Sequence, residues 1–135
     1  MPNPIADPMV EGVDSDANSQ LVQIAATSEG VVEVTLNRPD RKNAFDAALI
    51  AALHEAFLTL HGSEHVRVVF IRGAGKLFCA GADLDWMKAA AEHTEADNRD
   101  DALQMAKMFK ALWDIPALTV AVIQGGAYGG GAGLA

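Results

Sequence analysis

The chain has 135 residues, 50% of them hydrophobic, and a formal net charge of −8. These values are typical of one globular domain with a buried core and exclude a disordered chain. The acidic balance argues against nucleic-acid binding, because neutralising phosphates requires clustered Lys and Arg. No apolar run is long enough to span a membrane and no signal peptide is visible. We therefore expect a cytoplasmic protein that makes no membrane contact and keeps its single cysteine, Cys79, reduced.

The N-terminal part of the chain predicts a tail and then a β-hairpin. Residues 1–20 contain three prolines and little periodicity, so we expect a mobile tail. Residues 21–26 and 31–36 are rich in β-forming side chains, and a turn is predicted at residues 28–30. Apolar and polar side chains alternate in the second strand, so one of its faces is expected to be buried.

A loop and a helix are predicted next. Residues 37–43 form a loop by composition, and either Asn43 or Asp46 is the expected N-cap of the following helix. Apolar residues recur at helical spacing over residues 47–61, and Gly62 is the expected end of that helix.

Two strands and two further helices are predicted in the rest of the chain. A nearly continuous apolar run over residues 66–71 predicts a buried strand. Residues 84–91 predict a helix, for which Asp83 is the expected N-cap rather than a catalytic acid. Residues 118–123 predict a short apolar strand that is buried on both faces.

A further helix is predicted over residues 102–113, with Phe109 and Trp113 expected in the core. The polar segment before it, residues 92–101, is either an exposed loop or a short helix capped by Thr94. The alternating order of strands and helices predicts an α/β fold with a layered sheet.

Two loops of small residues follow the two apolar strands. In residues 77–84, the small residues at positions 80–82 allow close approach to the backbone. The N–H groups at a helix start have no partner within the helix, which favours negative charge there. Residues 125–133 form a second such loop. We predict that the two loops meet and hold one oxygen atom.

Four segments of the chain resemble the crotonase superfamily, the enoyl-CoA hydratase/isomerase family. They are residues 36–39 with 43–45, residues 66–71 with Gly73, residues 78–84, and residues 124–131. The resemblance implies that residues 21–135 are the N-terminal portion of a crotonase-like ββα spiral, the ClpP/crotonase fold. It covers about the first half of a family member. Residues 82–87 are most similar to the methylglutaconyl-CoA hydratases of leucine breakdown.

The resemblance implies binding of an acyl-CoA thioester, with its carbonyl oxygen held by the backbone N–H groups of Ala82 and Gly130. Such an oxyanion hole stabilises an enolate during syn-hydration of an enoyl-CoA such as methylglutaconyl-CoA. Coenzyme A is part of the substrate, and neither a separate cofactor nor a metal is implied. Arg38 is implied near the nucleotide end of the substrate. The other implied substrate-binding residues are Arg41, Lys42, Ala44, Ala80, Asp83, Leu84, Asp85, Tyr128 and Gly133. The resemblance also implies that the full-length protein forms a homotrimer or a hexamer.

The chain departs from the family pattern at Gly133, where two-acid hydratases carry a glutamate, and the family's other acid lies beyond Ala135. Water addition needs a positioned group of tuned pKa, so we interpret the chain as an incomplete piece that does not turn over alone. The alternatives are an enoyl-CoA isomerase and a catalytically dead acyl-CoA-binding fragment. A nucleotide-binding domain is a third alternative, although the glycines of residues 125–133 reverse the usual dinucleotide spacing.

Some single residues keep two interpretations. Tyr128 either lines the acyl site or only packs, and Asp85 is either solvated or near a substrate carboxylate. Trp86 is expected in a pocket wall or in the core. Cys79 is expected to be a buried packing residue. The four histidines show no metal-ligand spacing.

Overall fold

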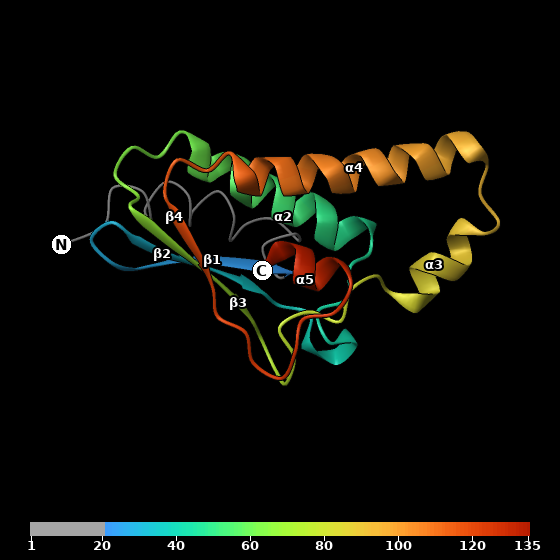
Figure 1. Ribbon diagram of the computed structural model, residues 1–135, viewed down its shortest axis with the longest axis horizontal. Coiled ribbons are helices and arrows are strands. Elements are labelled where there is room, and N and C mark those ends of the chain that lie inside the picture. The colour runs from blue at the N-terminus through green and yellow to red at the C-terminus, as the bar shows by residue number, and fades with distance from the viewer. Residues whose placement is uncertain (1–20) are drawn as a thin grey trace.

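The computed structural model describes residues 21–135, so the tail predicted for residues 1–20 lies outside the described residues. A single twisted sheet lies beneath two long helices, and a shorter helix extends away from them (Figure 1). The strands lie in the order β1, β2, β3, β4. Strand bounds are β1 Val22–Ser28, β2 Val31–Leu36, β3 Val68–Gly73 and β4 Leu118–Ala121.

The predicted β-hairpin is confirmed. Strands β1 and β2 pair antiparallel, whereas β2, β3 and β4 run parallel to one another. The alternation in β2 is also confirmed, because Val32 and Val34 are fully buried while Glu33 between them is half-buried. Their partners across the parallel ladder, Val69 and Ile71, are buried on the same face. This face forms the sheet side of the core.

Helix α2 (Ala47–His61) has the predicted bounds. Of the two N-cap candidates the structure selects Asp46, whose carboxylate accepts the Leu49 N–H at 2.9 Å. The helix packs against β1 and β2 on one side and against the long helix α4 on another. Its apolar positions at helical spacing are all buried: Leu49, Ile50, Leu53, Ala56, Phe57 and Leu60. Burial of each large side chain stabilises the fold by about 1.5–3 kcal/mol, so the packing of α2 contributes strongly to the stability of the core.

Helix α4 (Glu95–Trp113) begins seven residues earlier than the helix predicted over residues 102–113. The Thr94 hydroxyl accepts the Asp97 N–H at 3.1 Å, so the predicted Thr94 cap is confirmed and the loop interpretation is wrong. The capped helix is not a separate short one, because it continues through residues 102–113. The hydrogen bond at the N-cap stabilises the polar, acidic first half of the helix, which is continuous with the more apolar second half.

The buried side of α4 differs from the prediction. Trp113 is 86% exposed, while Met108 and Ala111 are buried and Phe109 is half-buried. Two apolar stripes overlap on this helix: Met108 and Ala111 belong to the buried core, whereas Trp113 at the end of the predicted stripe does not. Helical spacing identifies a stripe but does not choose between two neighbouring stripes.

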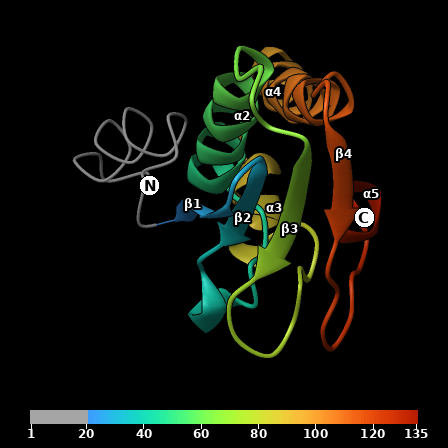
Figure 2. The same cartoon turned by 90° about the vertical axis from the view of Figure 1, so that its left-hand side faces the viewer.

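Strand β4 is shorter than predicted and is not buried on both faces. It ends at Ala121, and Leu118 is 65% exposed. Within residues 21–135 the strand pairs only with β3 and forms the edge of the sheet (Figure 2). Strand β3 also begins two residues later than the predicted segment 66–71. In the part of the chain that is described, no helix is long and apolar enough to cross a lipid bilayer.

Candidate functional site

The loops that leave β3 and β4 run close together beyond the same end of the sheet (Figure 2). An isolated parallel bridge joins Cys79 to Ala127. Around this bridge, the Tyr128 N–H donates to the Cys79 carbonyl at 3.0 Å, and the Phe78 N–H donates to the Gln124 carbonyl at 2.9 Å. The predicted meeting of the two small-residue loops is therefore confirmed.

Glycines make this close contact possible. A Cβ atom at Gly131 would lie 2.5 Å from the Cys79 carbonyl oxygen. A Cβ atom at Gly81, whose φ is +91°, would lie 2.8 Å from the Tyr128 carbonyl oxygen. Since real Cβ contacts are not that short, side chains at these two positions would push the loops apart.

The Ala82 N–H is oriented by the segment before α2. The Phe45 N–H donates to the Gly81 carbonyl at 2.7 Å, and the Phe45 carbonyl accepts the Asp83 N–H at 2.8 Å. The Gly81–Ala82 peptide is planar and trans, so its N–H points opposite to its carbonyl and away from Phe45. Within residues 21–135 the Ala82 N–H donates to no acceptor.

The Gly130 N–H is oriented by the first turn of α5 (Gly130–Leu134). The Gly129 carbonyl points into that turn and accepts the Ala132 N–H at 3.0 Å. By the same planarity, the Gly130 N–H points out of the turn, and no described residue accepts it. Gly129 also lies against Gly81, since a Cβ on Gly129 would be 3.9 Å from the Gly81 Cα.

Phe45 contacts both loops, one through its backbone and the other through its ring. Its backbone brackets Ala82, and its ring lies where a Cβ at Gly130 would be only 2.8 Å from Cε2. The ring is fully buried and stacks edge-on against Phe109 with centroids 6.4 Å apart. This supporting role is not visible in the sequence, because it depends on contacts between distant segments.

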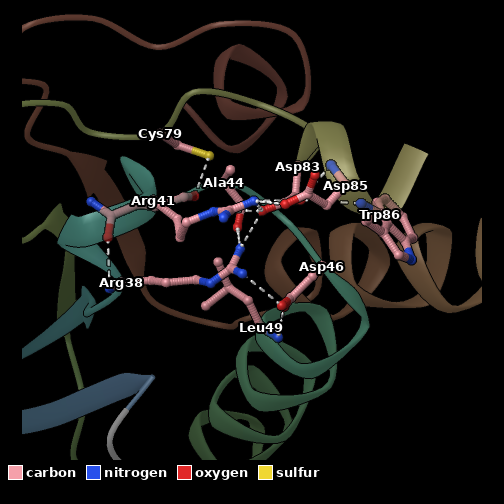
Figure 3. Close-up of polar contacts among 10 residues, drawn as sticks. Arg38, Arg41, Ala44, Asp46, Leu49, Cys79, Asp83, Asp85 and Trp86 are labelled. Carbon is pink, nitrogen blue, oxygen red and sulfur yellow. Dashed lines mark hydrogen bonds and ion pairs between the residues drawn. The ribbon is translucent and has the colours of Figure 1, made fainter. Parts of the chain in front are cut away.

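Asp83 is the N-cap of α3 (Leu84–Ala90), as predicted. Its carboxylate is 3% exposed and accepts the Asp85 and Trp86 N–H groups at 2.8 and 3.1 Å (Figure 3). Arg38 and Arg41 donate to the other side of the same carboxylate, each at 3.0 Å.

Two of the basic residues near Asp83, Arg38 and Arg41, are thus paired with carboxylates. The Arg41 guanidinium also contacts Asp85 at 2.6 Å, and these carboxylates raise the pKa of Arg41 through hydrogen bonds to Asp85 and Asp83. Of the three basic residues that the resemblance implies near the nucleotide, Lys42 is exposed and Arg38 is the most buried. Their contact with a substrate phosphate stays a prediction.

Several effects determine the protonation of Asp83. Burial, the largest single effect, raises the pKa of the carboxyl group. The hydrogen bond from the Trp86 N–H and those from Arg41 and Arg38 outweigh burial together and hold the pKa below its ordinary value of 3.8. Asp83 is therefore ionised at neutral pH, where it caps α3 and pairs with two arginines.

A pH-dependent contribution to stability follows from Asp83. A carboxyl group with a lowered pKa stabilises the fold above its unfolded value and loses this contribution as the pH falls through its folded value. We expect Asp83→Asn to lower the free energy of unfolding by about 3 kcal/mol at neutral pH, because it leaves Arg38 without its buried partner. The difference from the unsubstituted protein should shrink below pH 3.8.

Urea unfolding of both proteins across this pH range would measure the effect. Asp85→Asn is the matched control, because the Asp85 side chain is 71% exposed and its pairing with Arg41 is expected to contribute less than about 1 kcal/mol. A difference for Asp83→Asn that grows on acidification would contradict the expectation.

Asn43 is a structural residue that the sequence analysis missed. The sequence predicted for it only a possible role as the N-cap of α2. In the structure its side-chain amide is fully buried and donates to the carbonyls of Ala74, Leu77 and Phe78 at 2.8–3.2 Å. Its own φ is +56°, a conformation that Asn tolerates better than most residues. Gln124 donates to the Gly75 carbonyl at 3.1 Å. The loop after β3 is thus held by two side-chain amides.

The remaining predicted residues lie around the two loops. Ala44 is buried and Ala80 is half-buried, with its N–H donating to the Lys42 carbonyl at 3.0 Å. Leu84 is 70% exposed. Tyr128 is 56% exposed and its ring lies over Gly126, so it both packs and remains accessible. Gly133, the last of the predicted substrate-binding residues, lies beside the Phe109 ring.

A shallow cavity of about 60 Å³ lies between α2, α3 and α4, with Trp86 in its wall. It is far smaller than the roughly 300–1,000 Å³ of a typical ligand pocket, and neither Ala82 nor Gly130 lines it. Cys79 is buried as expected, and burial raises the pKa of its thiol. Between residues 21 and 135, no three His, Cys, Asp or Glu side chains are grouped so that they could hold a metal ion.

Comparison with known proteins decides the family. The sequence profile described as enoyl-CoA hydratase/isomerase matches residues 26–135, nearly the whole described chain. The chain belongs to the enoyl-CoA hydratase/isomerase family. It is 36% identical to a putative enoyl-CoA hydratase of Thermus thermophilus over 105 residues, which are 78% of this chain and 42% of that protein. It is 34% identical to the mitochondrial Delta(3,5)-Delta(2,4)-dienoyl-CoA isomerase of Mus musculus over 131 residues, 89% of this chain and 39% of that protein.

Solved structures of the family confirm the crotonase fold. The crystal structure of an enoyl-CoA hydratase from Shewanella pealeana superposes with a TM-score of 0.84 at 31% identity. The superposition covers 92% of this chain and 46% of that structure. The chain thus spans less than half the length of the relatives named here, and the fold it shares with them is the N-terminal region of the family.

Proposed function

We propose that the whole protein binds an acyl-CoA thioester and stabilises its enolate between the backbone N–H groups of Ala82 and Gly130. The observation that supports this most is the orientation of the two donors. Each N–H points away from the element that holds its peptide, and the residues that precede them, Gly81 and Gly129, are in contact. Coenzyme A enters as part of the substrate, and the proposal requires no other cofactor.

The proposed reaction is the syn-hydration of an enoyl-CoA such as methylglutaconyl-CoA. Water adds to the β-carbon, the double-bond electrons move onto the thioester oxygen as an enolate, and a proton then returns to the α-carbon. One preorganised donor in an acyl-transfer site contributes roughly 3–4 kcal/mol to stabilising such an oxyanion. Donors that belong to the backbone need no reorganisation as the charge develops.

Proton transfer requires a further group. Asp83 lies next to the donor at Ala82, but its low pKa and the hydrogen bonds that it accepts from four residues keep it ionised and occupied. Gly133 has no side chain that could transfer a proton. We therefore assign general acid–base catalysis to a carboxyl group of the whole protein outside residues 21–135.

A double-bond isomerisation is the second candidate, favoured by the 34% identity to the mouse dienoyl-CoA isomerase over 89% of this chain. It would use the same enolate, but a proton leaves one carbon and returns to another without adding water. A single positioned carboxyl group can serve both transfers, which suits a chain with glycine at position 133.

Binding of acetoacetyl-CoA to the full-length protein tests the proposal. The enolate of this ligand absorbs in the near ultraviolet. We therefore expect the absorbance to rise on binding, because the two N–H donors favour the charged form. Folded protein that binds neither acetoacetyl-CoA nor other thioesters would overturn the proposal, and binding of NAD in their place would favour the nucleotide-binding alternative. Turnover of an enoyl-CoA in isotopically labelled water then separates the two reactions, since only hydration places the labelled oxygen in the product.

A further inference from the structure

We propose that Arg38 is a positioning residue for the Ala82 donor. Its guanidinium joins the N-caps of α2 and α3 and so fixes the peptide that carries the Ala82 N–H. The inference rests on the proposed function, because Ala82 matters for chemistry only if its N–H receives the thioester oxygen.

Arg38 connects two capping carboxylates. Each carboxylate uses one oxygen for its own helix: Asp46 Oδ1 accepts the Leu49 N–H at 2.9 Å, and Asp83 Oδ1 accepts the Asp85 N–H at 2.8 Å. Each then turns its other oxygen to Arg38, with Nη2 and Nη1 both at 3.0 Å (Figure 3). One side chain thus couples the starts of two helices, which are separated in the chain by β3 and its exit loop.

The same guanidinium also reaches the segment that faces Ala82. Arg38 Nη1 donates to the Ala44 carbonyl at 2.8 Å. The next residue, Phe45, brackets Ala82 by accepting the Asp83 N–H and donating to the Gly81 carbonyl. Arg38 therefore contacts both sides of the Phe45–Ala82 bridge, through Ala44 on one side and Asp83 on the other.

The shape of the guanidinium matters for this role. Its N–H groups form a fixed planar fork, whereas a lysine ammonium is a single point charge that cannot reach two carboxylates and a carbonyl in the same geometry. The Arg38 side chain is only 17% exposed, so its contacts are shielded from water. Arg41 is 41% exposed and shares itself between Asp83 and an exposed carboxylate, so it is expected to contribute less to positioning.

Arg38→Lys keeps the charge and removes the fork, so it tests positioning. We expect it to lower the enolate fraction of bound acetoacetyl-CoA about tenfold to a hundredfold, because displacing a reacting group by about 1 Å has an effect of that order. Affinity for an alkyl-CoA thioether, which has no carbonyl oxygen, should fall much less than the enolate fraction, because lysine keeps the positive charge near the nucleotide end. Arg72→Lys is the matched control, because Arg72 forms an ion pair with Glu33 of the neighbouring strand and takes no part in the contacts of Arg38 with Ala44 and Asp83. It should change neither quantity.

Asp46→Asn is the second variant, in case Arg38→Lys does not fold. Asparagine caps a helix as well as aspartate does but cannot form the ion pair with Arg38, so the same selective loss is expected. An unchanged enolate fraction in either folded variant, or an equal loss of acetoacetyl-CoA and thioether affinity, overturns the positioning role. Unsubstituted protein that binds acetoacetyl-CoA without forming the enolate overturns the proposed function instead, whatever the variants do.

Discussion

Replacing Gly130 with proline should lower the enolate fraction of bound acetoacetyl-CoA about a hundredfold below that of Gly130→Ala. Proline has no N–H to donate, and removal of one oxyanion-hole donor in other enzymes has effects of about 10²–10³. Gly130 is the first residue of α5, a position at which proline suits a helix. The variant is therefore expected to change the donor and not the turn.

Gly130→Ala is the control that this experiment needs. Both substitutions add a Cβ atom that would lie 2.8 Å from Cε2 of the buried Phe45 ring, so both are expected to strain the packing there. Only the proline also removes the N–H, and the comparison between the two variants isolates the donor. Equal enolate fractions in folded Gly130→Pro and Gly130→Ala would rule out Gly130 as a donor.

Gly125→Ala should lower the free energy of unfolding by about 3 kcal/mol. The residue has a φ of +69°, which costs other residues about 1–2 kcal/mol. An added Cβ would also lie 2.1 Å from the Lys76 carbonyl oxygen, and overpacking of this kind costs about 1–3 kcal/mol more. Because that carbonyl belongs to the loop after β3, relief of the clash would separate the two loops of the site.

Urea unfolding measures this loss against Gly62→Ala. Gly62 follows α2 with a φ of −86°, and no atom lies within 4 Å of a Cβ built there, so its replacement should change stability by less than about 1 kcal/mol. If the two alanine variants unfold at the same urea concentration with the same slope, the close approach at Gly125 is not a constraint on the fold.

The family and its loops were accessible from the sequence because each signal lies in contiguous residues. The bounds of α2 follow from helical spacing between Asp46 and Gly62. The meeting of residues 77–84 with residues 125–133 was predicted from their small residues and from the family resemblance. The structure explains it, because both loops follow parallel strands of one sheet and loops at the same ends of such strands lie together.

Other features could not be predicted, because they depend on which distant partner a side chain meets. Asn43 looked like a helix cap, and its bonds to carbonyls 31 to 35 residues away are set only when the loops close over it. The pairing of Arg38 with Asp83 joins residues 45 positions apart. A charged loop residue has many possible partners in the sequence, and the one it meets is chosen by how the helices are placed.

By itself, the sequence determined the hairpin, α2, the Asp83 cap and the family, since local periodicity, capping and motif spacing are properties of neighbouring residues. Only the tertiary structure decided which side of α4 is buried and that Leu118 in β4 is exposed. It also decided that Phe45 contacts the segments that carry Ala82 and Gly130 and that Arg38 spans two helix caps. The physical reason is that burial and ion pairing depend on the distances between elements, which the order of residues along the chain does not specify.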